Sequence, residues 1–303
     1  MRNSGTFLCL ASGASFGAMA IFGKLAYDGG ATPGTLLVVR FSLAAALFWL
    51  VVLATGAARE ARAVPRADVA LGLALGGCGY AIQAGCYFAA LERIDASLLS
   101  LLLYTFPAIV ALAAVALGRE RLDTRRFAAL ALALGGVALV MAGAGPGSVD
   151  PVGAALALGA AFVYSAYILV SDRVAGRVSP YVLSAIVCTG AAASLVVATS
   201  LLGALRPGQV SLEGWAWLGC LTLVSTVAAI GLFFAGLRRA GPTAASILAT
   251  IEPVVTVLLA FLVFGETLGA LGLVGGLLVL SAVFALHARL PRRSPEPALS
   301  GAS

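Results

Sequence analysis

The chain has 303 residues, of which 61% are hydrophobic and 11% are charged, and its formal net charge at pH 7 is +6. Soluble domains are about 45–50% apolar and about 25% charged, so this composition excludes an ordinary water-facing globule. The surplus of basic residues does not indicate a nucleic-acid-binding protein, because it is concentrated in alternate short segments between long apolar runs. That distribution is typical of a chain that crosses a lipid bilayer.

Ten apolar segments follow one another along the chain, each close to the 20 or so residues that span the hydrocarbon core. Backbone groups in lipid must form their hydrogen bonds within the segment, so each segment is predicted to be a helix and the fold an all-α integral membrane protein. Barrel strands would alternate in polarity over about ten residues, and these runs do not alternate. The ten predicted helices are residues 5–26, 34–54, 69–91, 96–118, 127–144, 152–171, 180–202, 214–236, 243–264 and 270–288.

Basic side chains set the expected orientation. Arg62, Arg121 and Arg239 lie in segments that alternate with arginine-poor segments, and the positive-inside rule places the basic segments in the cytoplasm. Both termini are then cytoplasmic, and the expected location is the inner (plasma) membrane. The polar, Pro- and Ser-rich tail 289–303 is predicted to be a disordered cytoplasmic extension.

The sequence repeats itself at an offset of 146 residues. LASGASFGAMA at 10–20 matches LALGAAFVYSA at 156–166, and a proline that precedes a glutamate by thirteen residues recurs at Pro107 and Pro253. Each repeat holds five predicted helices, an odd number, so the second repeat must insert in the opposite orientation. Inverted repeats around a site near the bilayer midplane are typical of secondary transporters. The two predicted repeats are residues 1–145 and 150–288.

Several of these features resemble the EamA family of the drug/metabolite transporter (DMT) superfamily over residues 5–288. They are ten segments in two repeats, the proline and glutamate of the fourth and ninth segments, and the pair Arg40–Phe41 in the second. The resemblance implies a basket of ten helices around a central cavity, opened by the fourth and ninth helices and their neighbours. It also implies export of amino acids or other metabolites, the activity of many relatives. Arg119 departs from the family, which usually has Gly before the residue that is Glu120 here.

Polar and aromatic side chains recur at positions i, i+3 and i+7 in four of the predicted helices, a spacing that places them on one helix face. Four such faces turned toward one place would line a cavity suited to a small zwitterion with an apolar side chain. The alternative is structural, because Ser and Thr often join membrane helices and Tyr often lies at the membrane interface. The predicted substrate-binding residues on these faces are Tyr80, Gln83, Tyr87, Tyr104, Tyr164 and Thr250.

Charged side chains also fall inside the predicted helices, where a charge costs about 2.5–3.5 kcal/mol. Arg40 is expected to extend to the interface, to pair with Glu252, or to bind a substrate carboxylate. Glu252 has three interpretations too: it pairs with Arg40 or binds a water, it carries a proton that drives transport, or it binds a substrate amine. Both residues therefore join the predicted substrate-binding set. Lys24 is expected to extend to the outer interface.

Pro107 and Pro253 predict bends in the fourth and ninth helices. A proline has no N–H, so the carbonyl group four residues before it loses its helical partner. The affected carbonyl groups belong to Leu103 and Ala249. The two prolines are therefore predicted to be helix hinges, one for each gate.

No pattern of catalytic or metal-binding chemistry occurs in the sequence. The chain has a single histidine and no CxxC pair, and its five cysteines are predicted to be free thiols in or near apolar segments. An HExxH motif, paired acids at catalytic spacing and a nucleotide-binding loop are also absent. We therefore expect no enzyme activity, no cofactor and no metal.

The leading interpretation is a secondary transporter of the inner membrane that exports amino acids or similar small metabolites. The alternative is a drug or other metabolite carrier of the same superfamily, for example for sugars or nucleosides. An ion channel is disfavoured, because inverted repeats with kinked helices suit alternating access. The expected partners are a small-molecule substrate, the lipid bilayer and, in one interpretation of Glu252, protons. The sequence leaves the substrate, the direction of flux, the coupling ion and the oligomeric state open.

Overall fold

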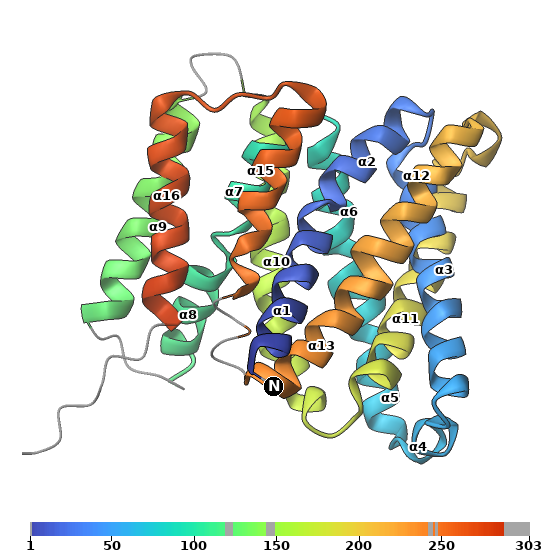
Figure 1. Cartoon of the computed structure of the whole chain (residues 1–303). Helices are drawn as coiled ribbons and strands as arrows, with labels where there is room; N and C mark the ends of the chain where they lie inside the picture. Colours follow the sequence, from blue (N-terminus) through green and yellow to red (C-terminus); the bar gives the residue numbers. More distant parts are fainter. Residues whose placement is uncertain (1, 119–123, 144–148, 242–244, 246–247, 288–303) are drawn as a thin grey trace, which may run out of the picture.

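The chain is all-helical over the part that the structure, a computed structural model, describes (Figure 1). No β-strand occurs in that part, as the composition predicts. The predicted tail 289–303 and Glu120 lie outside the described residues. The described residues are 2–118, 124–143, 149–241, 245 and 248–287.

Helices of the first predicted repeat follow the apolar segments, but three segments are divided. The first is split into α1 and α2, the third contains a π-helical turn, and the fourth is broken into α7 and α8. The elements are α1 (Arg2–Gly17), α2 (Met19–Asp28), α3 (Pro33–Ala54), α4 (Ala58–Ala63), α5 (Arg66–Ala74), the π-helix η1 (Leu75–Tyr80), α6 (Ala81–Leu91), α7 (Ala96–Leu103), α8 (Phe106–Ala116) and α9 (Thr124–Gly143).

The second predicted repeat has a similar series of helices, including a second π-helical turn in its third apolar segment. Such turns insert a residue into the helical ladder and are frequent at functional sites. The elements are α10 (Pro151–Ala175), α11 (Pro180–Leu201), the short 3₁₀-helix η2 (Pro207–Gln209), α12 (Leu212–Thr222), the π-helix η3 (Leu223–Ala228), α13 (Ala229–Ala240), α15 (Ile251–Phe264) and α16 (Ala270–His287).

Seven helices in the described residues are long and apolar enough to cross a membrane. Three shorter apolar helices, at 127–143, 251–264 and 270–285, occupy the remaining predicted segments. The structure thus supports a multi-pass membrane protein, and the count of ten spans stays a prediction.

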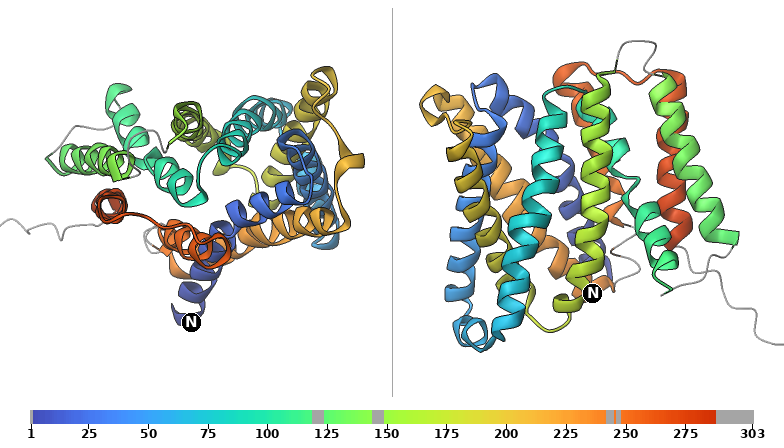
Figure 2. Two further views of the ribbon diagram at one scale, coloured as in Figure 1. Left: turned by 90° about the horizontal axis from the view of Figure 1, so that it is seen from above. Right: turned by 180° about the vertical axis from the view of Figure 1, so that it is seen from behind.

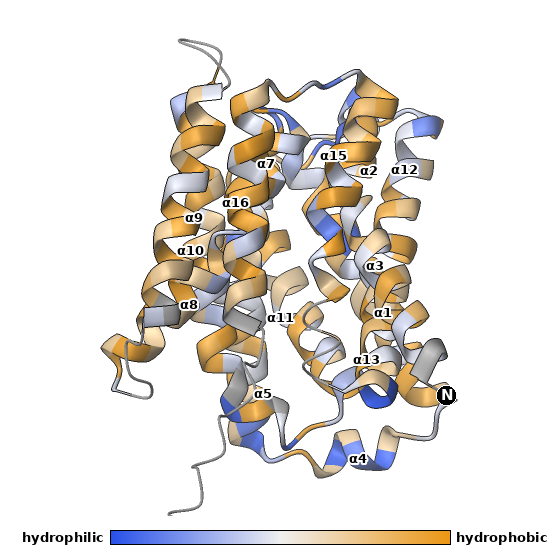
Figure 3. Cartoon of the chain, turned by 60° about the vertical axis from the view of Figure 1, so that its left-hand side comes forward, coloured by the Kyte–Doolittle hydropathy of each residue, from blue (hydrophilic) through white to orange (hydrophobic). Residues whose placement is uncertain are grey.

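The hydropathy of the residues differs between the length of the helices and the ends of the molecule. The N-terminus and α4 lie at one end, here called the N-terminal side, and the loops after α2 and α15 lie at the other, here called the far side (Figure 1). Apolar residues cover the helices along their length, whereas α4 at the N-terminal side is largely hydrophilic (Figure 3). This distribution is expected of helices whose middle parts face lipid.

One extensive core joins most helices, with Phe41, Phe48 and Phe88 among its fully buried side chains. The pair of α9 and α16 stands side by side at one edge of the molecule (Figures 1 and 2). They approach closely at Gly136 and Gly275, where a β-carbon added to Gly136 would lie 2.7 Å from the carbonyl oxygen of Gly275. Small residues at such a crossing let two membrane helices pack backbone to backbone.

Gly136→Ala is therefore expected to destabilise the folded chain by about 1–3 kcal/mol, the usual cost of overpacking. Gly135→Ala is the matched control, because a β-carbon at Gly135 meets nothing within 4 Å. Unfolding of both variants in mixed micelles measures the difference. Equal stability of the two variants would show that the α9–α16 contact tolerates a methyl group.

A cluster of polar contacts closes the far side. Glu266, in the loop after α15, accepts hydrogen bonds from Lys24 Nζ at 2.6 Å and from Ser97 Oγ at 2.8 Å. The backbone amides of Ala96 and Ser97, at the start of α7, donate to the same carboxylate at 3.1 and 3.0 Å. We call this cluster the far-side latch, because it ties α2, α7 and the end of α15 together. Lys24 was expected to extend to the outer interface; it extends toward the far side and forms an ion pair with Glu266 there.

The latch also perturbs the titration of Glu266. Burial by itself would raise the pKa of this carboxyl group, but the hydrogen bonds from Lys24 and Ser97 prevail and hold the pKa below its usual range. A carboxyl group with a lowered pKa in the folded state stabilises that state above its ordinary pKa. The contribution is lost as the pH falls through the lowered value.

Glu266→Gln should therefore be less stable than the wild type near neutral pH, and the difference should shrink as the pH falls below about 4. Thermal unfolding in detergent across this range measures it. Glu213→Gln, at the start of α12, is the control, because Glu213 only accepts one exposed hydrogen bond from Trp217. A wild-type stability that falls no further than that of Glu266→Gln on acidification would contradict the assigned role of the carboxylate.

Candidate functional site

A cavity of about 920 Å³ lies between the helices, and all eight predicted substrate-binding residues line it. They come from six elements that the sequence places far apart. The proline of the first predicted hinge, Pro107, lines the cavity as well. The eight residues are Arg40 of α3, Tyr80 of η1, Gln83 and Tyr87 of α6, Tyr104 after α7, Tyr164 of α10, and Thr250 and Glu252 around the start of α15.

The cavity extends toward the N-terminal side. Its lining includes Ser12 of α1 and Val110 and Ala114 of α8, and both stretches lie toward that side in Figure 1. None of its described lining residues belongs to the far-side loops, which the latch holds together. The described lining therefore reaches toward the N-terminal side and does not include the far-side loops.

Two helix breaks meet at the cavity. Tyr104 and Thr105 form a turn between α7 and α8, and Pro107 follows in the first turn of α8. Thr250 forms a turn before α15, and Pro253 lies in the first turn of that helix. A proline is tolerated there because the first amides of a helix have no helical partner. The structure thus places both predicted hinge residues next to a break in the helical ladder.

Arg40 is turned into the protein instead of toward the interface. Its side chain is 2% exposed, its Nε donates to Thr226 Oγ1 at 3.0 Å, and its Nη2 donates to the Tyr80 hydroxyl at 3.4 Å. The guanidinium carbon lies 5.1 Å from the Phe41 ring and 5.4 Å from the Phe88 ring, a favourable setting for a cation. Two of the five N–H groups of the guanidinium donate to hydroxyl groups, so three have no acceptor among the described residues.

Glu252 also lines this cavity, and among the described residues it forms no ion pair with Arg40, which contradicts that interpretation for this state. Its Oε2 accepts a hydrogen bond from the Tyr104 hydroxyl at 2.9 Å. The same hydroxyl lies 3.0 Å from the carbonyl oxygen of Ala249, which Pro253 deprives of its helical donor. The cavity therefore contains one unpaired cation and one unpaired acid.

Gln83 is a further polar residue that lines the cavity together with Arg40 and Glu252. Its side chain is 7% exposed and lines the cavity, yet its amide forms no hydrogen bond with any other described residue. The hydroxyl groups of Tyr87 and Tyr164 likewise form no hydrogen bond with any other described residue. An amide that lines the cavity and has no partner in the described protein can bond with a polar ligand or with water there.

A series of aromatic rings connects the charged groups, and the sequence patterns missed part of it. The ring centroids of neighbours in the series lie 4.8–6.2 Å apart. Phe106 and Tyr167 belong to it but are absent from the predicted set, as is Thr226, the partner of Arg40. Phe106 gave no signal, because an apolar ring in an apolar segment looks like core. The series runs through Phe41, Tyr80, Tyr167, Tyr164, Phe106 and Tyr104.

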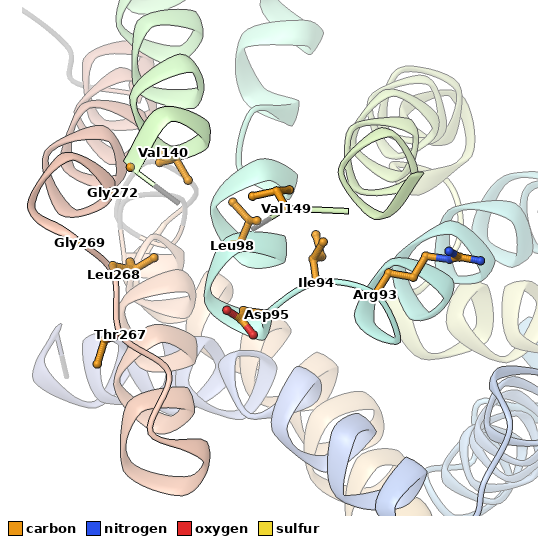
Figure 4. Close-up of a pocket in the computed structure, with 11 residues that line it drawn as sticks. Arg93, Ile94, Asp95, Leu98, Val140, Val149, Thr267, Leu268, Gly269 and Gly272 are labelled. Atoms are coloured by element: carbon orange, nitrogen blue, oxygen red, sulfur yellow. The ribbon is translucent and has the colours of Figure 1, made fainter. Parts of the chain in front are cut away.

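A second cavity of about 200 Å³ lies on the far side, near the latch (Figure 4). It is lined by Asp95, Leu98 and Thr267 together with residues of α9 and the start of α16. Its two charged residues have other contacts: Arg93 Nη1 donates to Asp150 Oδ2 at 3.1 Å, and Asp95 lies 3.7 Å from Lys24 Nζ. The central cavity is the better candidate, since its charges are unpaired and it holds more volume.

Among the described residues no cluster of His, Cys, Asp or Glu could hold a metal ion. The five cysteines are free.

Comparisons with known proteins agree with a membrane transporter. The EamA-like transporter family matches twice, over residues 3–142 and 151–287. The chain is similar to the "Uncharacterized transporter YcbK" of Bacillus subtilis (strain 168), with 25% identity over 90% of this chain and 89% of the relative. It is also similar to an "Uncharacterized transporter" of Archaeoglobus fulgidus, with 29% identity over 65% of this chain and 69% of the relative.

A solved crystal structure shares the fold. Its TM-score is 0.66 with 21% sequence identity, and the alignment covers 94% of this chain and 97% of that chain. Since the family matches nearly the whole length in two successive stretches, the chain is a multi-pass membrane protein that belongs to the EamA-like transporter family.

Proposed function

We propose that the protein is a secondary transporter of the inner membrane that exports amino acids or similar small metabolites by alternating access. In this proposal its ten helices form two inverted repeats, residues 1–145 and 150–288, and both termini are cytoplasmic. The N-terminal side is then the cytoplasmic side, so the described cavity is the one that loads substrate from the cell.

The observation that carries the proposal is the combination of Arg40, Glu252 and Gln83 in one cavity. An amino acid presents a carboxylate and an ammonium group on one carbon atom. The unused N–H groups of Arg40 suit the carboxylate, and the Glu252 carboxylate suits the ammonium group. The Gln83 amide supplies both a donor and an acceptor between them, and the aromatic rings suit an apolar side chain.

Sugars, nucleosides and neutral drugs fit the cavity less completely. A planar base or a sugar face would stack on the aromatic rings. Such a ligand would leave Arg40 and Glu252 buried without a charged partner, which is costly in a membrane protein. A zwitterion satisfies both charges, so we place amino acids ahead of the other carriers of the superfamily.

A counterflow panel in proteoliposomes tests the proposal. Vesicles loaded with one unlabelled compound should accumulate the labelled form of the same compound if it is carried. We expect saturable counterflow with amino acids and none with their amides, which lack the carboxylate. Counterflow of sugars or nucleosides without amino acids would replace the leading substrate class by the alternative.

Gln83→Leu should weaken substrate binding, because it removes a donor and an acceptor at nearly constant volume. The loss of such hydrogen bonds costs about 1–3 kcal/mol, and the apparent affinity in the counterflow assay should fall roughly 5- to 150-fold. Gln209→Leu is the matched control, since Gln209 is exposed in η2 and does not line the cavity. Equal affinities of the two variants would place the substrate elsewhere.

The proposed orientation predicts opposite labelling of the two sides. Single cysteines at Arg62 and Arg239, in a cysteine-free background, should be protected from an impermeant maleimide added to intact cells, because basic segments stay in the cytoplasm. A cysteine at Thr267, in the loop before α16, should react. Labelling at 62 and 239 with protection at 267 would reverse the orientation and turn the described cavity outward.

A further inference from the structure

Tyr104 connects the two broken helices through one hydroxyl group. It follows directly after α7, and its oxygen lies 3.0 Å from the carbonyl oxygen of Ala249 and 2.9 Å from Oε2 of Glu252. A tyrosine hydroxyl carries one hydrogen, and both a carbonyl oxygen and an ionised carboxylate can only accept. One hydrogen therefore faces two acceptors whenever Glu252 is ionised.

The Ala249 carbonyl needs a donor from outside its own helix. In an uninterrupted helix the amide of residue 253 would donate to it, but Pro253 has no N–H. The Tyr104 hydroxyl takes the place of that amide. Among the described residues this donor ties the break before α15 to the end of α7.

We propose that Glu252, Tyr104 and the Ala249 carbonyl form a proton-operated hinge, a helix break whose hydrogen bonds change when Glu252 gains or loses a proton. This inference rests on the proposed function, in which the hinge drives the transport step. With a proton on Glu252, the carboxyl O–H donates to the Tyr104 oxygen and the Tyr104 O–H donates to Ala249, so both contacts are full hydrogen bonds. When this proton leaves to the water of the cavity, the Tyr104 hydrogen turns to the carboxylate, because charged acceptors form the stronger bond. The Ala249 carbonyl is then released. Protonation therefore ties Tyr104 to both sides of the break before α15, and deprotonation leaves it bonded to the α15 side alone, which frees the break to bend.

Among the described residues that line the cavity, Glu252 is the group that can carry the proton. It is the only carboxylic acid there, and α1, α8, α13 and α16 contribute no titratable side chain. Tyrosine hydroxyls ordinarily keep their proton at neutral pH, and the arginine stays charged. The titratable and charged groups that face the cavity with Glu252 are Tyr104, Tyr80, Tyr87, Tyr164 and Arg40.

The break before α8 has no such switch. At the repeat offset of 146, Glu252 corresponds to Phe106, whose ring lies 5.7 Å from that of Tyr104. A phenyl ring exchanges no proton, so a change in pH acts on the α15 break alone. The proton-operated hinge therefore belongs to one of the two broken helices.

Distances between spin labels test the hinge without any substrate. Labels at Leu112 of α8 and Leu258 of α15, both exposed, report the relation of the two helices. In the wild type we expect a narrow distance distribution at low pH and a shifted or broader one at high pH. Glu252→Gln should keep the low-pH distribution at every pH, because its amide still donates to Tyr104. Tyr104→Phe should lose that distribution at every pH.

Two control variants and an infrared readout complete the test. Tyr181→Phe on α11 and Glu213→Gln on α12 lie outside the cavity and should titrate as the wild type does. The carboxyl band that disappears in Glu252→Gln should titrate together with the distances, across about pH 4 to 9. A Tyr104→Phe variant that titrates like the wild type would overturn the hinge. A band that does not titrate, or that titrates without any change of distance, would do the same.

These outcomes are separate from those of the transport assay. If the distances between the spin labels change with pH but the protein shows no amino-acid counterflow, the hinge is kept and the proposed substrate class is rejected. Amino-acid counterflow in a protein whose distances ignore pH would keep the proposed function and reject the hinge.

Discussion

A break in a membrane helix needs a partner for every backbone group that it frees, because the hydrocarbon core holds no water to replace the lost bond. Pro253 frees the carbonyl of Ala249, and Tyr104 supplies the missing donor from the end of α7. Tyr104 itself stands at the break before Pro107, so the first break supplies the donor for the second. This arrangement brings both breaks to the cavity. Glu252 reaches that cavity because it lies in the first turn of the helix that the break begins.

The buried charges fall into two kinds, and the difference separates structure from binding. Glu266 receives four hydrogen bonds, one of them from the Lys24 ammonium group, which leaves little capacity for a ligand. Arg40 and Glu252 are held in place by neutral neighbours, each with capacity left over. A charge in a membrane protein that is positioned but not neutralised is costly. It persists where a ligand or a proton completes it, which is why Arg40 and Glu252, and not the latch, mark the candidate site.

Helical spacing was sufficient to find the cavity wall but not its chemistry. Tyr80, Gln83 and Tyr87 share a helix face by their spacing alone, and the structure places that face on the cavity. Contacts between residues that lie far apart in the sequence leave no pattern in the neighbouring residues from which they could be predicted. Lys24 and Glu266 lie 242 residues apart, and Arg40 and Thr226 lie 186 apart, so neither pair was predictable from one sequence. The π-helical turns η1 and η3 were missed as well, because their residues are as apolar as those of a regular helix.

The latch and the acid at the break are both departures from a repeating sequence. At the offset of 146, Lys24 corresponds to Val170 and Glu252 to Phe106. In the proposed inverted repeat, exchanging the conformations of the two halves converts an inward-open molecule into an outward-open one. Identical halves would give the two states equal free energies, so any preference must come from positions where the halves differ. Lys24 stabilises closure of the far side, and Val170 brings no cation to the corresponding place. The asymmetry thus favours the state that the structure shows, with the far side latched and the cavity reaching the N-terminal side.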